Sequence, residues 1–212
     1  MRRDSEHAAI GIGFLIVFIA VILVVGMAAF ALLQVGQQLG IQSSKSGSTT
    51  ITDVSLGVKI STIQGYVESG LIKKLVMIVT PWPGSPAVDL STVRIELSDS
   101  NTKLVLNYNS SAFADATGGT NNVFTEPAFP TVGSSYGVIK LMDADGSCTA
   151  SRPVLNRGDN VMVAFNASAG FGGIGVSQRV TGEFIPENGA LSIISFFTPT
   201  AFADPVVILR PG

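Results

Sequence analysis

Residues 9–33 read AIGIGFLIVFIAVILVVGMAAFALL, an almost wholly apolar stretch, and no charged side chain follows until Lys45. A cleaved secretory core needs only about 7 to 15 apolar residues, whereas a bilayer-spanning helix needs about 20. The 25 residues of this stretch would form a helix about 38 Å long at about 1.5 Å per residue, enough to span with some tilt. A lone segment in lipid satisfies its backbone only as a helix, so the sequence predicts a membrane-spanning helix in spite of its β-branched residues.

Small residues recur along this predicted helix, and Gly36 and Gly40 form a small-xxx-small pair just beyond it. Such positions let helix backbones approach closely, which favours packing between copies of the helix. Glycine is also common in single apolar helices. The pattern alone therefore leaves self-association open.

Beyond the apolar stretch the sequence becomes polar and then β-rich. The stretch SSKSGSTT at 43–50 is typical of a helix end and hinge. Short alternating or apolar runs separated by turn residues predict strands. These runs lie at 51–60, 71–80, 92–98, 103–108, 137–143, 160–166, 176–184 and 191–197, with a last apolar run, PVVILRP, at 205–211. The fold class expected is a long N-terminal apolar helix followed by an all-β antiparallel sandwich, Ig-like or jelly-roll-like.

Composition excludes several classes of protein. The 212 residues suit one globular domain plus an appendage. The net charge is −2 and no more than two basic residues are adjacent, so no nucleic-acid partner is expected. The single cysteine, Cys148, excludes an intramolecular disulfide and fits a small buried residue.

Carboxylates offer one candidate ion site. Asp143 and Asp145 flank Ala144 and precede Gly146, a partial match to calcium-loop chemistry. The bidentate acid of such loops is missing from residues 147–150. Aspartates also favour ordinary hairpin turns, so Ca²⁺ is weighed here against a simple turn. No other cofactor is expected.

Two asparagines fit the N-x-[ST] acceptor pattern for N-linked glycans, Asn109 and Asn166. The pattern is short and also occurs by chance. Asn166 ends a predicted strand, so exposure favours Asn109 as the acceptor.

The run GIGFLIVFIA at 11–20 resembles the N-terminus of archaellins, the subunits of the archaeal motility filament. Further similarity lies in GSPAVDLS at 84–91, in DADGS at 143–147 with Gly158 and Asp159, and in IPENG at 185–189 leading to FFTPTAF. The resemblance therefore covers essentially the whole chain.

The resemblance implies a division of the chain and a route to the cell surface. Residues 1–8 would be a class III signal peptide, 9–50 the hydrophobic helix and hinge, and 51–212 the outer β-sandwich. A prepilin-peptidase-like signal peptidase would cut between Ala8 and Ala9. The family usually has Gly before the cut with Lys or Arg close by, whereas Glu6 and His7 stand here and the arginines lie farther back.

The resemblance also implies that the helix leaves the membrane and packs in the filament core. The residues assigned to this packing are Gly11, Gly13, Leu15, Phe18, Ala20 and Gly26. Archaellins are frequently N-glycosylated, which adds weight to the two asparagines. The partners implied are identical or similar subunits in a helical filament, the archaellum assembly machinery, and the cytoplasmic membrane before assembly.

The function expected is therefore structural, as an extracellular filament subunit. A subunit of an archaeal adhesive type IV-like pilus stays open as an alternative, as does an anchored accessory or stator component of the motor. An anchored enzyme is disfavoured, because the only histidine is His7 in the leader. Without it the remaining chain lacks the groups for Ser-His-Asp or Cys-His catalysis and for histidine-ligated metals.

Overall fold

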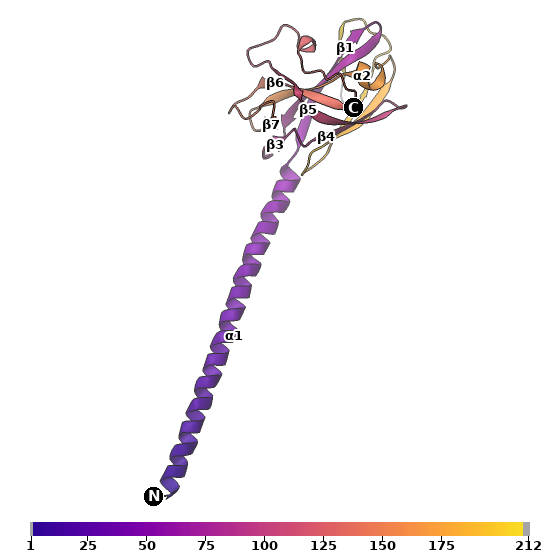
Figure 1. The fold of residues 1–212 in the computed structure, drawn as a ribbon. Coiled ribbons are helices and arrows are strands. Elements are labelled where there is room, and N and C mark those ends of the chain that lie inside the picture. The colour runs from indigo at the N-terminus through magenta and orange to yellow at the C-terminus, as the bar shows by residue number, and fades with distance from the viewer. Residues whose placement is uncertain (1, 210–212) are drawn as a thin grey trace. The chain divides into compact units, whose positions relative to one another are not determined.

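The computed structural model describes the chain from residue 2 to 209, except for the side chains of residues 2–9 and 52–54. The chain divides into two compact units, Met1–Thr50 and Ile51–Gly212. Helix α1 spans Arg2–Ser55, and the part Ile10–Ile51 is long and apolar enough to cross a membrane. The predicted long apolar helix is confirmed (Figure 1).

The helix continues farther than the sequence predicted. The helix end expected at 43–50 and the strand expected at 51–60 are wrong in their bounds, because α1 ends at Ser55. The hydroxyl of Thr49 donates to the carbonyl of Lys45 at 2.9 Å, and that of Thr50 donates to the carbonyl of Ser46 at 2.9 Å. These bonds to the preceding turn keep the polar side chains compatible with a helix.

Nine strands form one hydrogen-bonded sheet in the order β10-β9-β4-β5-β6-β8-β2-β1-β11. In chain order they are β1 (Val58–Glu68), β2 (Leu71–Pro81), β4 (Arg94–Ser98), β5 (Lys103–Asp115), β6 (Ser135–Met142), β8 (Asn160–Phe165), β9 (Arg179–Ile185), β10 (Ser192–Phe197) and β11 (Val206–Leu209). A second, small sheet pairs β3 (Val88–Asp89) with β7 (Val154–Leu155). Each predicted strand beyond residue 70 has an observed counterpart.

The sheet is largely antiparallel, with one exception. Strands β5 and β6 pair in parallel, where an all-antiparallel arrangement was expected. Parallel neighbours need a long crossover, and residues 116–134 provide it with the short 3-10 helix η1 (Val123–Thr125). This segment therefore brings the chain back to the level at which β5 begins, so that β6 can run in the same direction as β5.

The main core takes side chains from every strand of the large sheet, which curls around it. The two ends of the sheet approach each other. The amide of Ala190 donates to the carbonyl of Leu56 at 2.9 Å, and the hydroxyl of Ser192 donates to the carbonyl of Val58. The predicted largely antiparallel β domain is thus confirmed, although its strands form one continuous large sheet around this main core.

A second, smaller cluster lies on the opposite face of the sheet, under the 116–134 segment. It joins Phe124 and Ala128 of that segment to Val76, Ile139 and Met162 of β2, β6 and β8. These central strands are thus covered on both faces, which explains their continuous apolar runs. Strands β4, β9 and β10 instead alternate buried and more exposed residues, so one of their faces stays open to solvent.

Candidate functional site: an assembly helix and a carboxylate cluster

Helix α1 presents apolar side chains all around its circumference. Every side chain described between Ile10 and Ile51 is exposed within its own unit. A helix that is apolar on all sides is stable only in lipid or among other helices. The helix is therefore a segment built for an apolar environment that this single chain does not provide.

The predicted packing residues fall on two sides of this helix. At about 100° per residue, Gly11, Leu15, Phe18 and Gly26 share one side, while Gly13 and Ala20 lie on the opposite side. The large side chains of Leu15 and Phe18 are exposed, and nothing approaches the Cβ position of Gly13 within 4 Å. Two opposed packing sides suit a helix surrounded by neighbours rather than one half of a simple pair.

Ala8 and Ala9, the residues of the predicted cut, lie in the helical backbone of α1. Their side chains are outside the described part of the chain. The predicted cleavage therefore stays a prediction.

Three carboxylates meet in the loops that follow β6 and precede β8. One oxygen each of Asp143, Asp145 and Asp159 lies within 4.8 Å of the others. The structure thus brings the two predicted residues together and adds Asp159, which the sequence analysis did not assign as a ligand. Asp159 is only 3% exposed, so its negative charge lies in a setting that favours a compensating cation.

Backbone amides hold these carboxylates in place. Asp143 Oδ1 accepts from the amides of Gly146 at 2.9 Å and Ser147 at 3.2 Å. The two oxygens of Asp159 accept from the amides of Ala144 at 3.0 Å and Asn156 at 2.8 Å. The 143–147 turn is therefore tied to the loop before β8, which fixes the spacing of the three acids.

The charge of the cluster is only partly balanced by neighbouring side chains. Lys140 Nζ lies 3.3 Å from Asp143 Oδ2 and 2.9 Å from Asp115 Oδ2, so one cation serves two carboxylates. Hydrogen bonds from Ser147 hold the pKa of Asp145 below its ordinary value, so this carboxylate stays ionised to lower pH than an ordinary aspartate does. An all-oxygen cluster with excess negative charge suits Ca²⁺ or Mg²⁺ rather than zinc.

The missed ligand had one signal in the sequence. Asp159 follows Gly158 immediately before an apolar strand, 14 residues beyond Asp145. Calcium-loop spacing places the closing acid within the same loop. A ligand contributed by the next loop becomes visible only once the fold brings both loops together.

The two predicted glycan acceptors differ in their surroundings. Asn166 caps the short helix α2 (Ala167–Phe171), where its Oδ1 accepts from the amide of Ala169 at 3.1 Å. Its Nδ2 donates to the carbonyl of Pro130 at 3.0 Å. At Asn109 the Oδ1 accepts from the amide of Ser111 at 3.0 Å, and its Nδ2 has no partner among the residues described. The amide nitrogen that a glycan would occupy is thus available at Asn109 and engaged at Asn166.

Known proteins match this chain over nearly its whole length. The profile of the archaeal-type flagellin family matches residues 8–196. Flagellin B2 of Methanocaldococcus jannaschii is 38% identical over 207 residues, covering 97% of this chain and 95% of that protein. Flagellin B3 of Thermococcus kodakarensis is 33% identical, covering 99% of this chain and 100% of that protein.

Solved structures agree with these sequence matches. The crystal structure of the archaeal flagellin FlaB1 from Methanocaldococcus jannaschii is similar with a TM-score of 0.65 and 33% identity, covering 72% of this chain and 96% of that one. The archaeal flagellum of Methanospirillum hungatei strain JF1 is similar with a TM-score of 0.63, covering 93% of this chain and 98% of that one. At 18% identity the second match supports the fold alone.

Proposed function

This chain belongs to the archaeal-type flagellin family and is a structural subunit of the archaellum filament, not an enzyme, and from this premise we propose how it is stored and assembled. The filament is an extracellular surface appendage. The family match favours this function over the adhesive pilus and the accessory component that the sequence left open. The observation that carries the assembly proposal is the fully exposed apolar surface of α1.

The precursor is held in the cytoplasmic membrane by α1 before assembly. Residues 9–44 contain no charged side chain, and about 20 of them suffice to cross a bilayer. On assembly, dispersion contacts with neighbouring helices replace those with lipid chains, so one apolar surface serves both environments. Contacts between different surfaces of successive copies do not close into a ring, and they yield a helical polymer.

A prepilin-peptidase-like signal peptidase removes residues 1–8 and leaves Ala9 as the first residue. Arg2 and Arg3 are the basic residues of the leader, and basic residues favour the cytoplasmic side. Removal of Asp4 and Glu6 also takes two charged groups off the start of the helix.

Filaments sheared from cells that make this chain are expected to contain subunits that begin at Ala9. Electron microscopy identifies the helical filament, and mass spectrometry of the N-terminal peptide reads the cut. Subunits that retain Met1 in assembled filaments would contradict the cleavage but leave the filament function standing. The full chain found only in the membrane fraction, with no filament, would contradict assembly itself.

The same spectra test an N-linked glycan on Asn109, the acceptor whose amide nitrogen is available. We expect the peptide with residues 109–111 to carry added sugar mass that is lost in an Asn109→Gln variant. An unmodified Asn109 peptide from mature filaments would contradict this acceptor.

The carboxylate cluster binds a divalent cation, for which Ca²⁺ is the best match in ligand type. Its three acids carry three negative charges against the single shared Lys140. An ion there would join the turn at 143–147 to the loop at 156–159, and so stabilise this end of the β domain.

Millimolar Ca²⁺ is therefore expected to raise the thermal unfolding temperature of detergent-dispersed subunits, and excess EDTA to reverse the increase. A free Ca²⁺ concentration of about 100 times the dissociation constant would stabilise the folded state by about 2.7 kcal/mol. An Asp145→Asn variant retains a side-chain oxygen for the Ser147 amide and should lose most of the Ca²⁺-dependent increase. Identical unfolding temperatures with Ca²⁺ and with EDTA in the unchanged chain would show that the cluster is only a hydrogen-bonded turn.

A further inference from the structure

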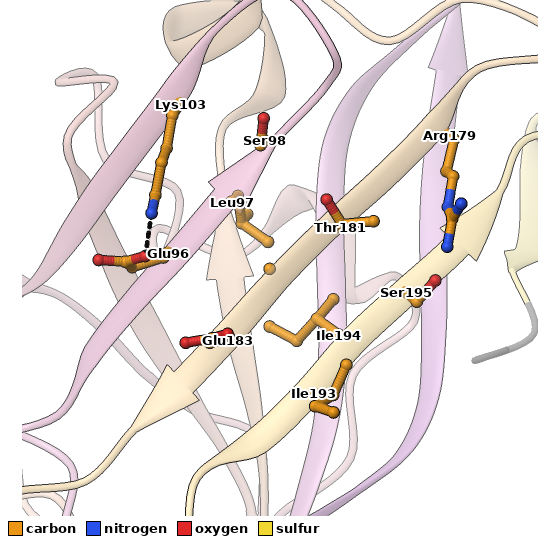
Figure 2. A pocket seen from close by; sticks show the side chains of 11 residues that line it. Glu96, Leu97, Ser98, Lys103, Arg179, Thr181, Glu183, Ile193, Ile194 and Ser195 are labelled. Atoms are coloured by element: carbon orange, nitrogen blue, oxygen red, sulfur yellow. Dashed lines mark ion pairs between the residues drawn. The ribbon is translucent and has the colours of Figure 1, made fainter.

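The outward face of strands β4, β9 and β10 is an uncovered surface of the β domain. Its members alternate with core residues along each strand. Cross-strand pairing aligns them in rows, with Ile193 opposite Glu183 and Glu183 opposite Glu96. We call this surface the β10 face, and it comprises Glu96, Ser98, Arg179, Thr181, Glu183, Ile193, Ser195 and Phe197. Figure 2 shows most of it from close by.

Two large apolar side chains are left in solvent on this face. Ile193 is 72% exposed and Phe197 is 62% exposed, and both lie on β10, the last strand at one end of the sheet. Soluble proteins usually protect such an edge with charge, proline or a covering segment. Here the 116–134 segment covers the outer face of the central strands instead. Apolar side chains grouped at an open edge are typical of a binding surface.

The charges of the β10 face are also incompletely matched. Two glutamates, Glu96 and Glu183, stand directly opposite each other, an arrangement that is unfavourable for like charges. Lys103 pairs with Glu96 at 2.5 Å, and within the described chain Glu183 has no ion-pair partner. Arg179 lies 5.3 Å from the centre of the Phe197 ring and likewise has no carboxylate partner among the described residues. The face therefore presents one unmatched charge of each sign beside its apolar groups.

A hollow of about 300 Å³ lies within this face, between Glu96, Glu183 and Ile193 (Figure 2). Gly182 lines it without a side chain, and the buried Leu97 and Ile194 also contribute to its lining. A Cβ at Gly182 would lie 2.0 Å from the Glu96 carbonyl oxygen, so the close approach of β9 to β4 requires glycine. Because the lining also includes the cations Lys103 and Arg179, the hollow presents charges of both signs beside Ile193, which fits an apolar side chain flanked by charged groups.

We infer that the β10 face binds the outer domain of a neighbouring copy of this chain in the filament. The inference rests on the filament function, which places many copies side by side. This chain can supply the matching charges, since Lys59 and Arg157 are exposed cations without an ion pair in the described structure, and Asp204 is an exposed carboxylate. Subunits of a polar filament all point the same way, so the face contacts a different surface of the next copy and not its own equivalent.

A single introduced thiol tests this contact in intact filaments. The one native cysteine, Cys148, is buried, and burial raises the pKa of its thiol to about 11, so it reacts slowly. An Ile193→Cys variant should react with a maleimide at least about tenfold more slowly in filaments than in detergent-dispersed subunits, because an interface core excludes solvent. The matched control is Val132→Cys, an exposed position in the segment before β6, which should react at similar rates in both states.

The outcomes separate this contact from the filament function. Equal rates at residue 193 in filaments and dispersed subunits would overturn the β10-face contact while the filaments themselves remain. If Ile193→Cys forms no filaments although its dispersed β domain is folded and Val132→Cys polymerises, the contact is supported. Failure of the unchanged chain to polymerise would instead overturn the proposed function.

The partner is identified by a benzophenone maleimide attached at residue 193 and activated by light within filaments. Capture of a second copy of this chain is expected to give a denatured species of twice the subunit mass, and mass spectrometry of that species reads which surface the captured peptide came from. Capture of a different protein alone, or of an intramolecular peptide alone, would contradict the inference.

Discussion

An Ala20→Glu variant is expected to form no filaments, although its β domain should fold normally. Residue 20 lies near the middle of the apolar stretch 9–33 of α1. A carboxylate at the centre of an apolar membrane helix costs about 3 kcal/mol on insertion scales. In the polymer the same charge would recur in every subunit, where it would face apolar neighbours, and no cationic side chain lies between residues 9 and 44 to pair with it. Electron microscopy of sheared cell surfaces measures filament number and length.

The matched control for this change is Ala20→Ser. Serine is close to alanine in size, and its hydroxyl can donate to the carbonyl one turn earlier, so it adds no unsatisfied group. Filaments of near-normal length are therefore expected from this variant. Both proteins should show the same protease-resistant β domain, since residues 1–50 and 51–212 form separate compact units. Normal filaments from Ala20→Glu would rule out a packing role for this side of the helix.

The helix illustrates what local sequence can establish. The absence of charge from residue 9 to Lys45 is a property of consecutive residues, so the helix could be predicted from length and hydropathy. Its end could not. The residues of SSKSGSTT are typical of a turn, yet Thr49 and Thr50 bond back to the preceding turn and α1 continues to Ser55. Ser and Thr can satisfy either conformation, and local sequence does not select between them.

The sheet shows the corresponding limit for long-range contacts. Strands such as β2 and β8 were predictable, because their apolar runs reflect burial on both faces. The parallel pairing of β5 with β6 was not, since it depends on the path of the 116–134 segment. Asp159 joins the carboxylate cluster through the same kind of contact between loops. The run LSIISFF predicted a strand, but only the fold shows that Ile193 and Phe197 of this run face solvent.

Replacing Gly137 by alanine is expected to be strongly destabilising, although the change adds a single methyl group. Gly137 lies in β6, where a Cβ would approach the carbonyl oxygen of Ala128 to 2.0 Å and that of Ala112 to 2.3 Å. Both neighbours are backbone atoms, so the 116–134 segment and the irregular part of β5 would have to move away. Overpacking of this kind costs about 3 kcal/mol, which corresponds to a fall of roughly 6–12 °C in unfolding temperature for a domain of this size.

The comparison variant is Gly118→Ala, in the same crossover segment. No atom lies within 4 Å of the Cβ position at Gly118, and its backbone does not require a positive φ. Alanine there restricts the unfolded chain and should leave the domain unchanged or more stable by about 0.4–1 kcal/mol. Circular dichroism of the dispersed subunits during heating measures both effects. Because each variant adds one methyl group, a large difference between them would locate the cost in the contact of residues 116–134 with β6. Equal unfolding temperatures would show that the crossover segment packs loosely and does not constrain the parallel pair beneath it.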